Sequence, residues 1–226
     1  MTKNLIIAGT TKGGTTSLFN YLADNKEICS VKNYKEIRFF LHDKYPVKSL
    51  LKFSNHEAET YKNLFLCKQT CKYTLDATPD YMYSQDNAKM IYETLGKDAK
   101  LIFILRNPFE RLVSWYRYAK QNAEIDNSMT FEEYIKVQLD NNTESKQNLL
   151  TYEQSFYSNY LKGYYNVFDK EQILIIFTEE LKSNPHKVLM EVTNYLNIDN
   201  DVYQDYEFKI FNKTEKMHYP LIHKYY

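Results

Sequence analysis

The stretch LIIAGTTKGGTTSLFNYL, residues 5–22, decides the fold of this chain. Its first four residues are apolar and predict a short buried strand, and the glycines and threonines behind them predict a tight turn. Leu18 and Leu22 are then one helical turn apart. The stretch therefore predicts a strand, a loop and a helix, in that order.

The same order of elements returns further along the chain. Residues 100–105, KLIFIL, form the continuous apolar run that is typical of a buried parallel strand, and Pro108 suits the first position of a helix behind it. Residues 173–177 predict another strand, and Asn184-Pro185 opens another helix. Alternating strands and helices imply an α/β fold with a P-loop-like parallel sheet flanked by helices on both faces.

Two further helices complete the predicted fold. We expect one over residues 84–95 and one from Thr130, where the sequence TFEE carries a capping box. A length of 226 residues suits one domain of ordinary size, and no repeat or low-complexity linker interrupts the sequence. We therefore expect a single domain over residues 1–226.

Composition narrows the class of partner and the compartment. Lys plus Arg and Asp plus Glu both number 29, and this zero net charge does not favour nucleic acid as a partner. No apolar run approaches the ~20 residues that cross a bilayer, and the apolar start is too short for a signal peptide. The three cysteines, Cys29, Cys67 and Cys71, are expected to be free thiols rather than metal ligands. We expect a cytoplasmic protein without a transmembrane segment or a metal.

The loop GTTKGGTT, residues 9–16, carries the signature of a phosphate cradle. Its glycines let amide groups turn inward, the helix behind it adds a partial positive charge, and hydroxyl groups add donors. The candidate ligands of the phosphate are Lys12, Gly13, Gly14, Thr15, Thr16 and Ser17. Thr15 stands where a nucleoside-triphosphate loop has its lysine, so ATP and GTP fit poorly. A nucleotide with one 5′-phosphate that carries a transferable group fits better.

A second anion site is expected on the same rim of the sheet. Arg106 follows the strand at residues 100–105, and Ser114 comes eight residues later on the next helix. The carboxyl ends of parallel strands line the ligand crevice of such folds, and the arginine fork matches a phosphate. Two anion sites suggest a nucleotide that is phosphorylated at two places.

With these motifs the chain resembles the sulfotransferases that use 3′-phosphoadenosine-5′-phosphosulfate (PAPS). It is most similar to the glycan-modifying branch, which includes heparan sulfate N- and O-sulfotransferases. GTTKGGTTSLFNYL matches the loop that holds the 5′-phosphosulfate, and LRNPFERLVSWY matches the R-x(7)-S pattern that holds the 3′-phosphate. The segments YTLDATPDYMY and ILIIFTEELKSNPHKVLMEVTNYLNI also look like family segments. The resemblance therefore covers nearly the whole chain.

The resemblance implies a reaction and roles for individual residues. A sulfuryl group passes from PAPS to a hydroxyl or amine acceptor, with a carbohydrate favoured, and PAP is the product. Glu36 in the sequence KEIRFF is implied as the base, with His42 as its competitor. Lys12 is implied to stabilise charge on the departing phosphate. Lys216, in the basic carboxyl-terminal loop, is implied to contact the nucleotide.

The sequence differs from the family pattern at some positions, and two rival functions are also compatible with it. Ala77 stands where O-sulfotransferases of this branch often have a lysine, and His218 lies near the position of a nucleotide-binding arginine. Four tyrosines are expected near the acceptor cleft: Tyr34, Tyr45, Tyr81 and Tyr83. The rival functions are a P-loop nucleotide kinase or NTPase and a catalytically inactive nucleotide- or glycan-binding module.

Overall fold

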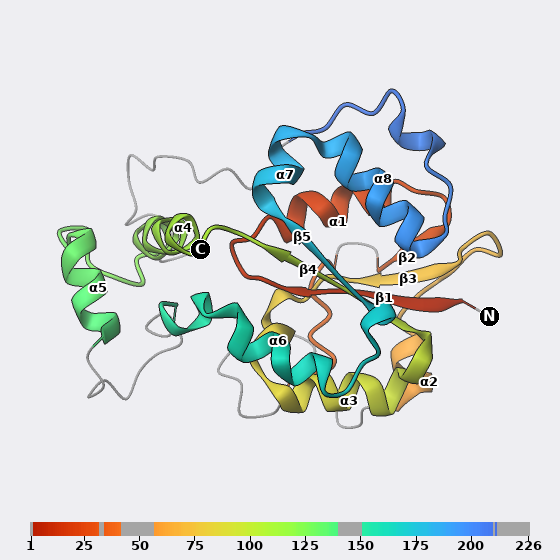
Figure 1. Cartoon of the computed structure of the whole chain (residues 1–226), viewed down its shortest axis with the longest axis horizontal. Helices are drawn as coiled ribbons and strands as arrows, with labels where there is room; N and C mark the ends of the chain where they lie inside the picture. Colours follow the sequence, from red (N-terminus) through yellow and green to blue (C-terminus); the bar gives the residue numbers. More distant parts are fainter. Residues whose placement is uncertain (1, 32–33, 42–56, 140–150, 210, 212–226) are drawn as a thin grey trace. The chain divides into compact units, whose positions relative to one another are not determined.

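The computed structural model describes residues 2–31, 34–41, 57–139, 151–209 and 211 (Figure 1). The chain divides into two compact units. Of the described residues, the first unit holds 2–31, 34–41, 57–106, 158–209 and 211, and the second holds 107–139 and 151–157. The expectation of one domain over residues 1–226 stays a prediction.

The first unit is built on a parallel sheet with the strand order β2-β3-β1-β4-β5. The strands are β1 (Lys3–Gly9), β2 (Ile28–Ser30), β3 (Tyr73–Asp76), β4 (Ala99–Leu105) and β5 (Ile173–Phe177). Every pairing is parallel; on β1, Ile6 lies opposite Asp76 of β3 and Leu101 of β4. The parallel sheet and the three strands expected near residues 5, 100 and 173 are confirmed, and β2 and β3 are additions that the sequence did not predict.

Helices cover both faces of this sheet, as expected (Figure 1). On one face lie α1 (Thr15–Ala23), α7 (Thr178–Ser183) and α8 (Pro185–Leu196). On the other lie α2 (Ala58–Lys62), α3 (Gln85–Leu95) and α6 (Tyr157–Tyr165). Short 3₁₀ turns stand between them: η1 (Pro79–Tyr83), η2 (Gly96–Asp98), η5 (Lys170–Gln172) and η6 (Asp201–Tyr203).

The apolar strands are continuous because both of their faces are buried. Ile102 and Ile104 of β4 belong to the core cluster that also holds Leu18 of α1 and Val192 of α8. From the same strand, the ring of Phe103 meets that of Tyr164 of α6, with 4.8 Å between the ring centroids. Successive residues of a strand point to opposite faces, so β4 packs against both helical layers.

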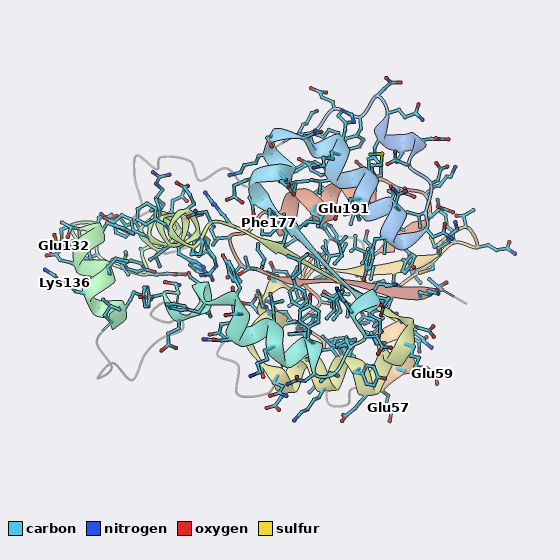
Figure 2. All side chains as sticks on the ribbon, in the orientation of Figure 1. Glu57, Glu59, Glu132, Lys136, Phe177 and Glu191 are labelled. Atoms are coloured by element: carbon cyan, nitrogen blue, oxygen red, sulfur yellow. The ribbon has the colours of Figure 1, made fainter. Side chains whose placement is uncertain are left out.

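The second unit contains α4 (Pro108–Gln121), α5 (Phe131–Leu139) and the turn η4 (Glu153–Ser155). The start of α5 has the predicted capping box: the Glu133 carboxylate accepts from the Thr130 amide at 2.7 Å, and the Thr130 hydroxyl accepts from the Glu133 amide at 3.2 Å. On the surface of α5, Lys136 pairs with Glu132 at 2.8 Å (Figure 2).

A buried arginine organises the inside of the second unit. Arg111 of α4 is fully buried, and its guanidinium donates to the Thr151 carbonyl at 2.9 Å and to the Gln154 side chain at 3.1 Å. A guanidinium buried in this way must have its donors satisfied, so these bonds tie α4 to η4.

Candidate functional site

The glycine loop, residues 9–16, joins the end of β1 to α1 and has a backbone that requires two of its glycines. Gly14, just before α1, has a φ of 96°, in the left-handed region that favours glycine. A Cβ on Gly13 would lie 2.6 Å from the Ile104 carbonyl oxygen. The loop therefore lies directly against β4, and a side chain at Gly13 would push it away, while one at Gly14 would strain the backbone.

Contacts from three elements fix the shape of the glycine loop. The Thr10 amide donates to the Ile104 carbonyl of β4 at 2.9 Å. The Tyr83 hydroxyl, at the end of η1, lies 2.6 Å from each of the hydroxyls of Thr10 and Thr11. The Thr178 hydroxyl, at the start of α7, donates to the Gly13 carbonyl. The loop is thus preorganised by the fold around it.

The loop presents a helix amino terminus as an anion cradle. No side chain caps α1, because Gly14 occupies the N-cap position. The amides of a first helical turn have no carbonyl partner within the helix, and they carry partial positive charge. Lys12 and Thr16 beside them are partly exposed. This geometry fits the predicted phosphate cradle, while the individual ligand roles of residues 12–17 stay predictions.

Arg106 lies against this cradle, as the sheet topology predicted. Its guanidinium donates to the Lys12 carbonyl at 3.4 Å. Ser114 lies in the second turn of α4, in the other unit, and is partly exposed. Its part in a 3′-phosphate site stays a prediction. Lys216 and His218 lie outside the described residues, as do His42 and Tyr45.

Glu36 is connected to the glycine loop through its neighbour Lys35. The Lys35 ammonium lies 3.0 Å from one Glu36 carboxylate oxygen and donates to the Thr15 hydroxyl at 3.3 Å. Arg38 holds the other carboxylate oxygen of Glu36 at 2.9 Å. Burial acts to raise the pKa of Glu36, but Lys35 and Arg38 outweigh it, so the pKa is lowered. Glu36 is therefore ionised at neutral pH, next to the first turn of α1.

A buried carboxyl beneath Glu36 holds this segment in place. Asp76 is fully buried at the end of β3 and accepts from the hydroxyls of Thr78, at 2.7 Å, and Tyr81, at 2.8 Å. Those two hydroxyls in turn accept from the backbone amides of Arg38, at 3.1 Å, and Phe40, at 3.3 Å. Burial raises the pKa of Asp76 to about 6, more than these hydrogen bonds lower it.

Comparison with known proteins decides the family. The model of the family described as "Sulfotransferase domain" matches residues 2–223. The chain belongs to this family. Over 194 residues it is 28% identical to mouse heparan sulfate glucosamine 3-O-sulfotransferase 5. The aligned region covers 85% of this chain and 53% of the mouse protein. The chain is 26% identical over 208 residues to the bifunctional heparan sulfate N-deacetylase/N-sulfotransferase 1 of Xenopus laevis, covering 87% of this chain and 22% of that protein.

Solved structures show the same fold. The structure of a sulfotransferase from Alicyclobacillus acidocaldarius superposes with a TM-score of 0.77 at 23% identity, over 95% of this chain and 87% of that one. A mouse sulfotransferase complexed with PAP superposes with a TM-score of 0.54 at 18% identity, over 88% of this chain and 59% of the mouse chain. The chain thus spans about half the length of the mouse 3-O-sulfotransferase and most of the bacterial one.

The structure corrects the acceptor-side expectations for this sulfotransferase domain. Tyr81 was expected near a cleft, but it is fully buried, and its hydroxyl donates a hydrogen bond to the buried Asp76 carboxylate. Tyr83 is partly exposed and its hydroxyl holds the glycine loop through Thr10 and Thr11, so its place near the acceptor cleft stays a prediction. The side chain of Ala77 is buried in the core, where it has no exposed surface. Tyr34 lines a pocket.

Sequence reasoning missed Lys35, Thr178 and Tyr83 as supports of the site. Lys35 stands directly before Glu36 in the sequence, so the pair was visible, but its bond to Thr15 depends on the folded chain. Thr178 follows β5 directly, at the carboxyl end where this fold places ligand sites. This position at the end of a predicted strand could have indicated from the sequence that Thr178 lies at the site.

Three remaining expectations concern thiols, metals and membranes. Cys29, Cys67 and Cys71 are free thiols, as predicted, and burial, with contact to the other two, raises the pKa of Cys29. Within the described part of the chain, no three His, Cys, Asp or Glu side chains gather in a way that could hold a metal ion. Among the helices of that same part, none is both long enough and apolar enough to cross a membrane.

Proposed function

We propose that this chain transfers a sulfuryl group from PAPS to a hydroxyl or amine of a carbohydrate acceptor. The observation that carries the proposal is the bridge from Glu36 through Lys35 to Thr15. It brings an ionised carboxylate next to an anion cradle, which is what proton removal from an acceptor beside a phosphosulfate requires. The heparan sulfate sulfotransferases to which the chain is similar support the carbohydrate acceptor.

The residues of the cradle fit this donor better than a nucleoside triphosphate. The amino terminus of α1, which no side chain caps, suits a 5′-phosphate. Thr15 provides no ammonium for a γ-phosphate, whereas Arg106 beside Lys12 adds a cation for a further phosphate. The PAP in the mouse sulfotransferase structure is consistent with this choice of nucleotide.

The proposed step is an in-line displacement at sulfur. Glu36 takes the proton of the acceptor as the acceptor oxygen or nitrogen forms its bond to sulfur. The bond between sulfur and the bridging oxygen breaks, and its electron pair stays on the departing 5′-phosphate. Lys12 and the amino terminus of α1 lie at the site proposed for that phosphate, so they stabilise the charge that grows there. Lys35, between base and loop, keeps Glu36 ionised and oriented.

Two measurements on the purified chain test the proposal. Thermal unfolding with PAP should show a higher Tm than without ligand, and ATP with Mg²⁺ should show little change. Transfer of label from PAPS to a panel of oligosaccharides should then depend on Glu36. Glu36→Gln should lose transfer and keep PAP binding, and His42→Ala serves as the matched variant that keeps both.

The rival functions predict different results. A kinase or NTPase would be stabilised by ATP with Mg²⁺ and not by PAP. An inactive binding module would bind PAP and transfer to no acceptor in the panel. Full activity of Glu36→Gln together with an inactive His42→Ala would show that the base is misassigned.

A further inference from the structure

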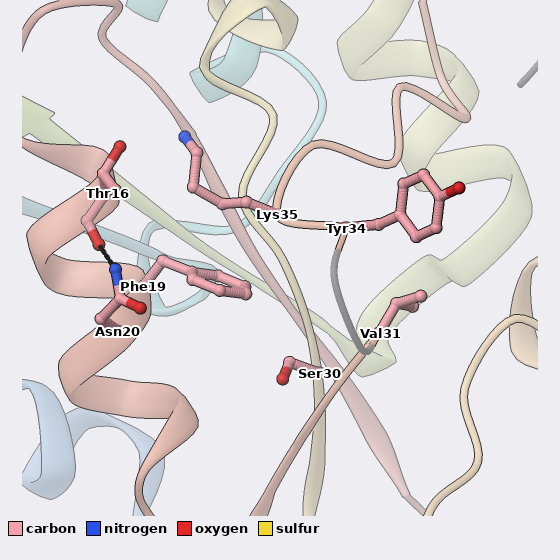
Figure 3. Close-up of a pocket in the computed structure, with 7 residues that line it drawn as sticks. All are labelled: Thr16, Phe19, Asn20, Ser30, Val31, Tyr34 and Lys35. Atoms are coloured by element: carbon pink, nitrogen blue, oxygen red, sulfur yellow. Dashed lines mark hydrogen bonds between the residues drawn. The ribbon is translucent and has the colours of Figure 1, made fainter. Parts of the chain in front are cut away.

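A pocket with a volume of about 410 Å³ opens beside the Lys35–Glu36 pair. The residues that line it are Thr16, Phe19, Asn20, Ser30, Val31, Tyr34 and Lys35 (Figure 3). They come from one face of α1, from the carboxyl end of β2 and from the segment that leads to Glu36. Small-molecule sites span roughly 300–1,000 Å³ and favour the carboxyl ends of parallel strands. This pocket suits a small ligand or one part of a larger one.

The position of Lys35 connects the pocket to the proposed chemistry. In Figure 3 its ammonium end turns toward the beginning of α1, where Thr16 lies. The same ammonium contacts Thr15 of the cradle and the carboxylate of Glu36. A ligand in the pocket therefore lies next to both the base and the donor loop, which is where an acceptor must bind.

The chemistry of the lining is that of an uncharged, hydroxyl-rich ligand. Thr16 and Ser30 contribute hydroxyls, Asn20 an amide, and Phe19 and Tyr34 aromatic rings. The Tyr34 side chain is 44% exposed, which leaves its ring open to a partner. Hydroxyls and amides both donate to and accept from sugar hydroxyls, while rings pack on the apolar face of a sugar.

The charge of the lining argues against an anionic ligand. Among the described residues that line the pocket, Lys35 is the one charged side chain, and its ammonium is already paired with Glu36. A sulfate or carboxylate leaving water needs an arginine or lysine of its own, and a carboxylate such as Glu36 nearby repels it. A neutral ring meets no such penalty.

We propose that this pocket binds an uncharged sugar ring of the acceptor, next to the group that Glu36 deprotonates. The inference rests on the proposed function and names the substrate class of the same site. It separates this chain from the relatives whose names specify heparan sulfate, a glycan that carries sulfate groups.

The test compares acceptors that differ in charge alone. Oligosaccharides of glucose or N-acetylglucosamine are assayed with PAPS beside counterparts in which uronic acids or sulfated sugars replace the neutral ring. The neutral set should have the higher kcat/KM, by about tenfold or more, since the anionic counterparts lack a cation to pair with. Binding of each oligosaccharide in the presence of PAP, measured by calorimetry, gives a readout that does not need turnover.

Two pairs of variants assign the effect to this pocket. Ser30→Arg adds a guanidinium and should shift the preference about tenfold toward anionic acceptors, whereas Ser30→Gln, its uncharged control, should not. Tyr34→Ala should raise the KM for a neutral acceptor about tenfold, while Tyr34→Phe keeps the ring and the KM. PAP affinity should stay unchanged in Ser30→Gln, Tyr34→Ala and Tyr34→Phe, because these three variants add no charge and neither residue belongs to the cradle.

Each outcome decides the proposal. It is overturned if the wild type prefers sulfated or carboxylated acceptors, if no neutral oligosaccharide binds in the presence of PAP, or if Tyr34→Ala changes no acceptor's KM or affinity. In those cases intact PAP binding with transfer to any acceptor still upholds the proposed function. Absence of PAP binding would refute the proposed function itself.

Discussion

The glycine loop, residues 9–16, and the segment that carries Glu36, residues 34–40, are held in place in different ways. The loop has backbone bonds from Thr10 to β4 and, at 3.0 Å, from Gly13 to the Thr10 carbonyl, and the hydroxyls of Tyr83 and Thr178 support it. The Glu36 segment has a backbone bond from the Ala77 amide to the Lys35 carbonyl, at 3.0 Å, and otherwise depends on a buried polar network. Thr78 and Tyr81 bind its amides, and Asp76 binds both of those hydroxyls.

This difference separates two kinds of dependence. The backbone bonds of the loop and its contacts with Tyr83 and Thr178 do not use the Lys12 side chain, so replacing that side chain should change donor chemistry and leave the rest of the fold alone. A segment fixed by a buried polar network responds to changes at residues that touch no substrate. Substitutions in the two regions should therefore differ in which kinetic parameter they change.

Lys12→Ala should cause the largest loss. The ammonium is expected to act on charge that develops only as the phosphate departs, so kcat should fall by about 10²–10³. The thermal midpoint should stay close to the wild-type value, since Lys12 is partly exposed and the backbone bonds of the loop remain. Steady-state kinetics and a thermal melt measure both. Wild-type turnover by this variant would remove Lys12 from the mechanism.

Lys35→Met should reduce kcat by about tenfold, a smaller loss than that of Lys12→Ala. It should also change the pH dependence of the reaction. Lys35 helps to lower the pKa of Glu36, so its removal raises that pKa. The base is active when ionised, and the acid limb of kcat/KM should therefore move to higher pH.

The matched control for Lys35 is Lys72→Met. Lys72 also pairs with a glutamate, Glu27, at 2.8 Å, but it lies away from the glycine loop, between β2 and β3. The control should keep the wild-type pH profile. An unchanged acid limb in Lys35→Met would mean that Lys35 does not govern the ionisation of Glu36.

The same division explains what the sequence predicted and what it did not. The strands β1, β4 and β5 are continuous apolar runs because helices cover both faces of the sheet, and the glycine loop is local, so both could be predicted. β2 has three residues, and β3 carries Thr74 and the buried Asp76, so neither has an apolar pattern long enough to predict a strand. The bond between Lys35 and Thr15 and the Asp76 network join distant residues, which no local pattern encodes.

Arg106→Ala should act on binding of the donor rather than on the chemical step. The guanidinium lies against the Lys12 carbonyl and is expected to hold a phosphate equally in the ground and transition states. The KM for PAPS should therefore rise about tenfold, with kcat nearly unchanged. Arg106→Lys keeps the charge but not the fork, so it should restore part of the affinity. A large fall in kcat at saturating PAPS would place Arg106 in the chemical step instead.

Asp76→Asn should have the smallest effect on transfer, and its main signature is in stability. Burial raises the pKa of Asp76 from 3.8 to about 6, so the folded state holds a proton that the unfolded state has lost between these pH values. Stability from this group is therefore complete below about pH 4 and is lost as pH rises through about 6. An asparagine does not titrate, so the Asp76→Asn variant lacks this pH-dependent loss of stability.

Urea unfolding at pH 4, 5, 6 and 7 measures this effect directly. The free energy of unfolding of the wild type, relative to Asp76→Asn, should fall with rising pH up to about 6 and level off above it; a change of about 1.4 kcal/mol corresponds to each pKa unit. Asp205→Asn, at an exposed position, is the control that removes a carboxylate outside the buried network. Because Asp76 contacts the Glu36 segment through Thr78, Tyr81 and the Ile37 amide and acts on Glu36 itself only by charge, its variant should lower kcat a few-fold and leave PAP affinity intact. A loss of PAP affinity equal to the loss of kcat would contradict the division, since it would show that the glycine loop depends on the same buried network.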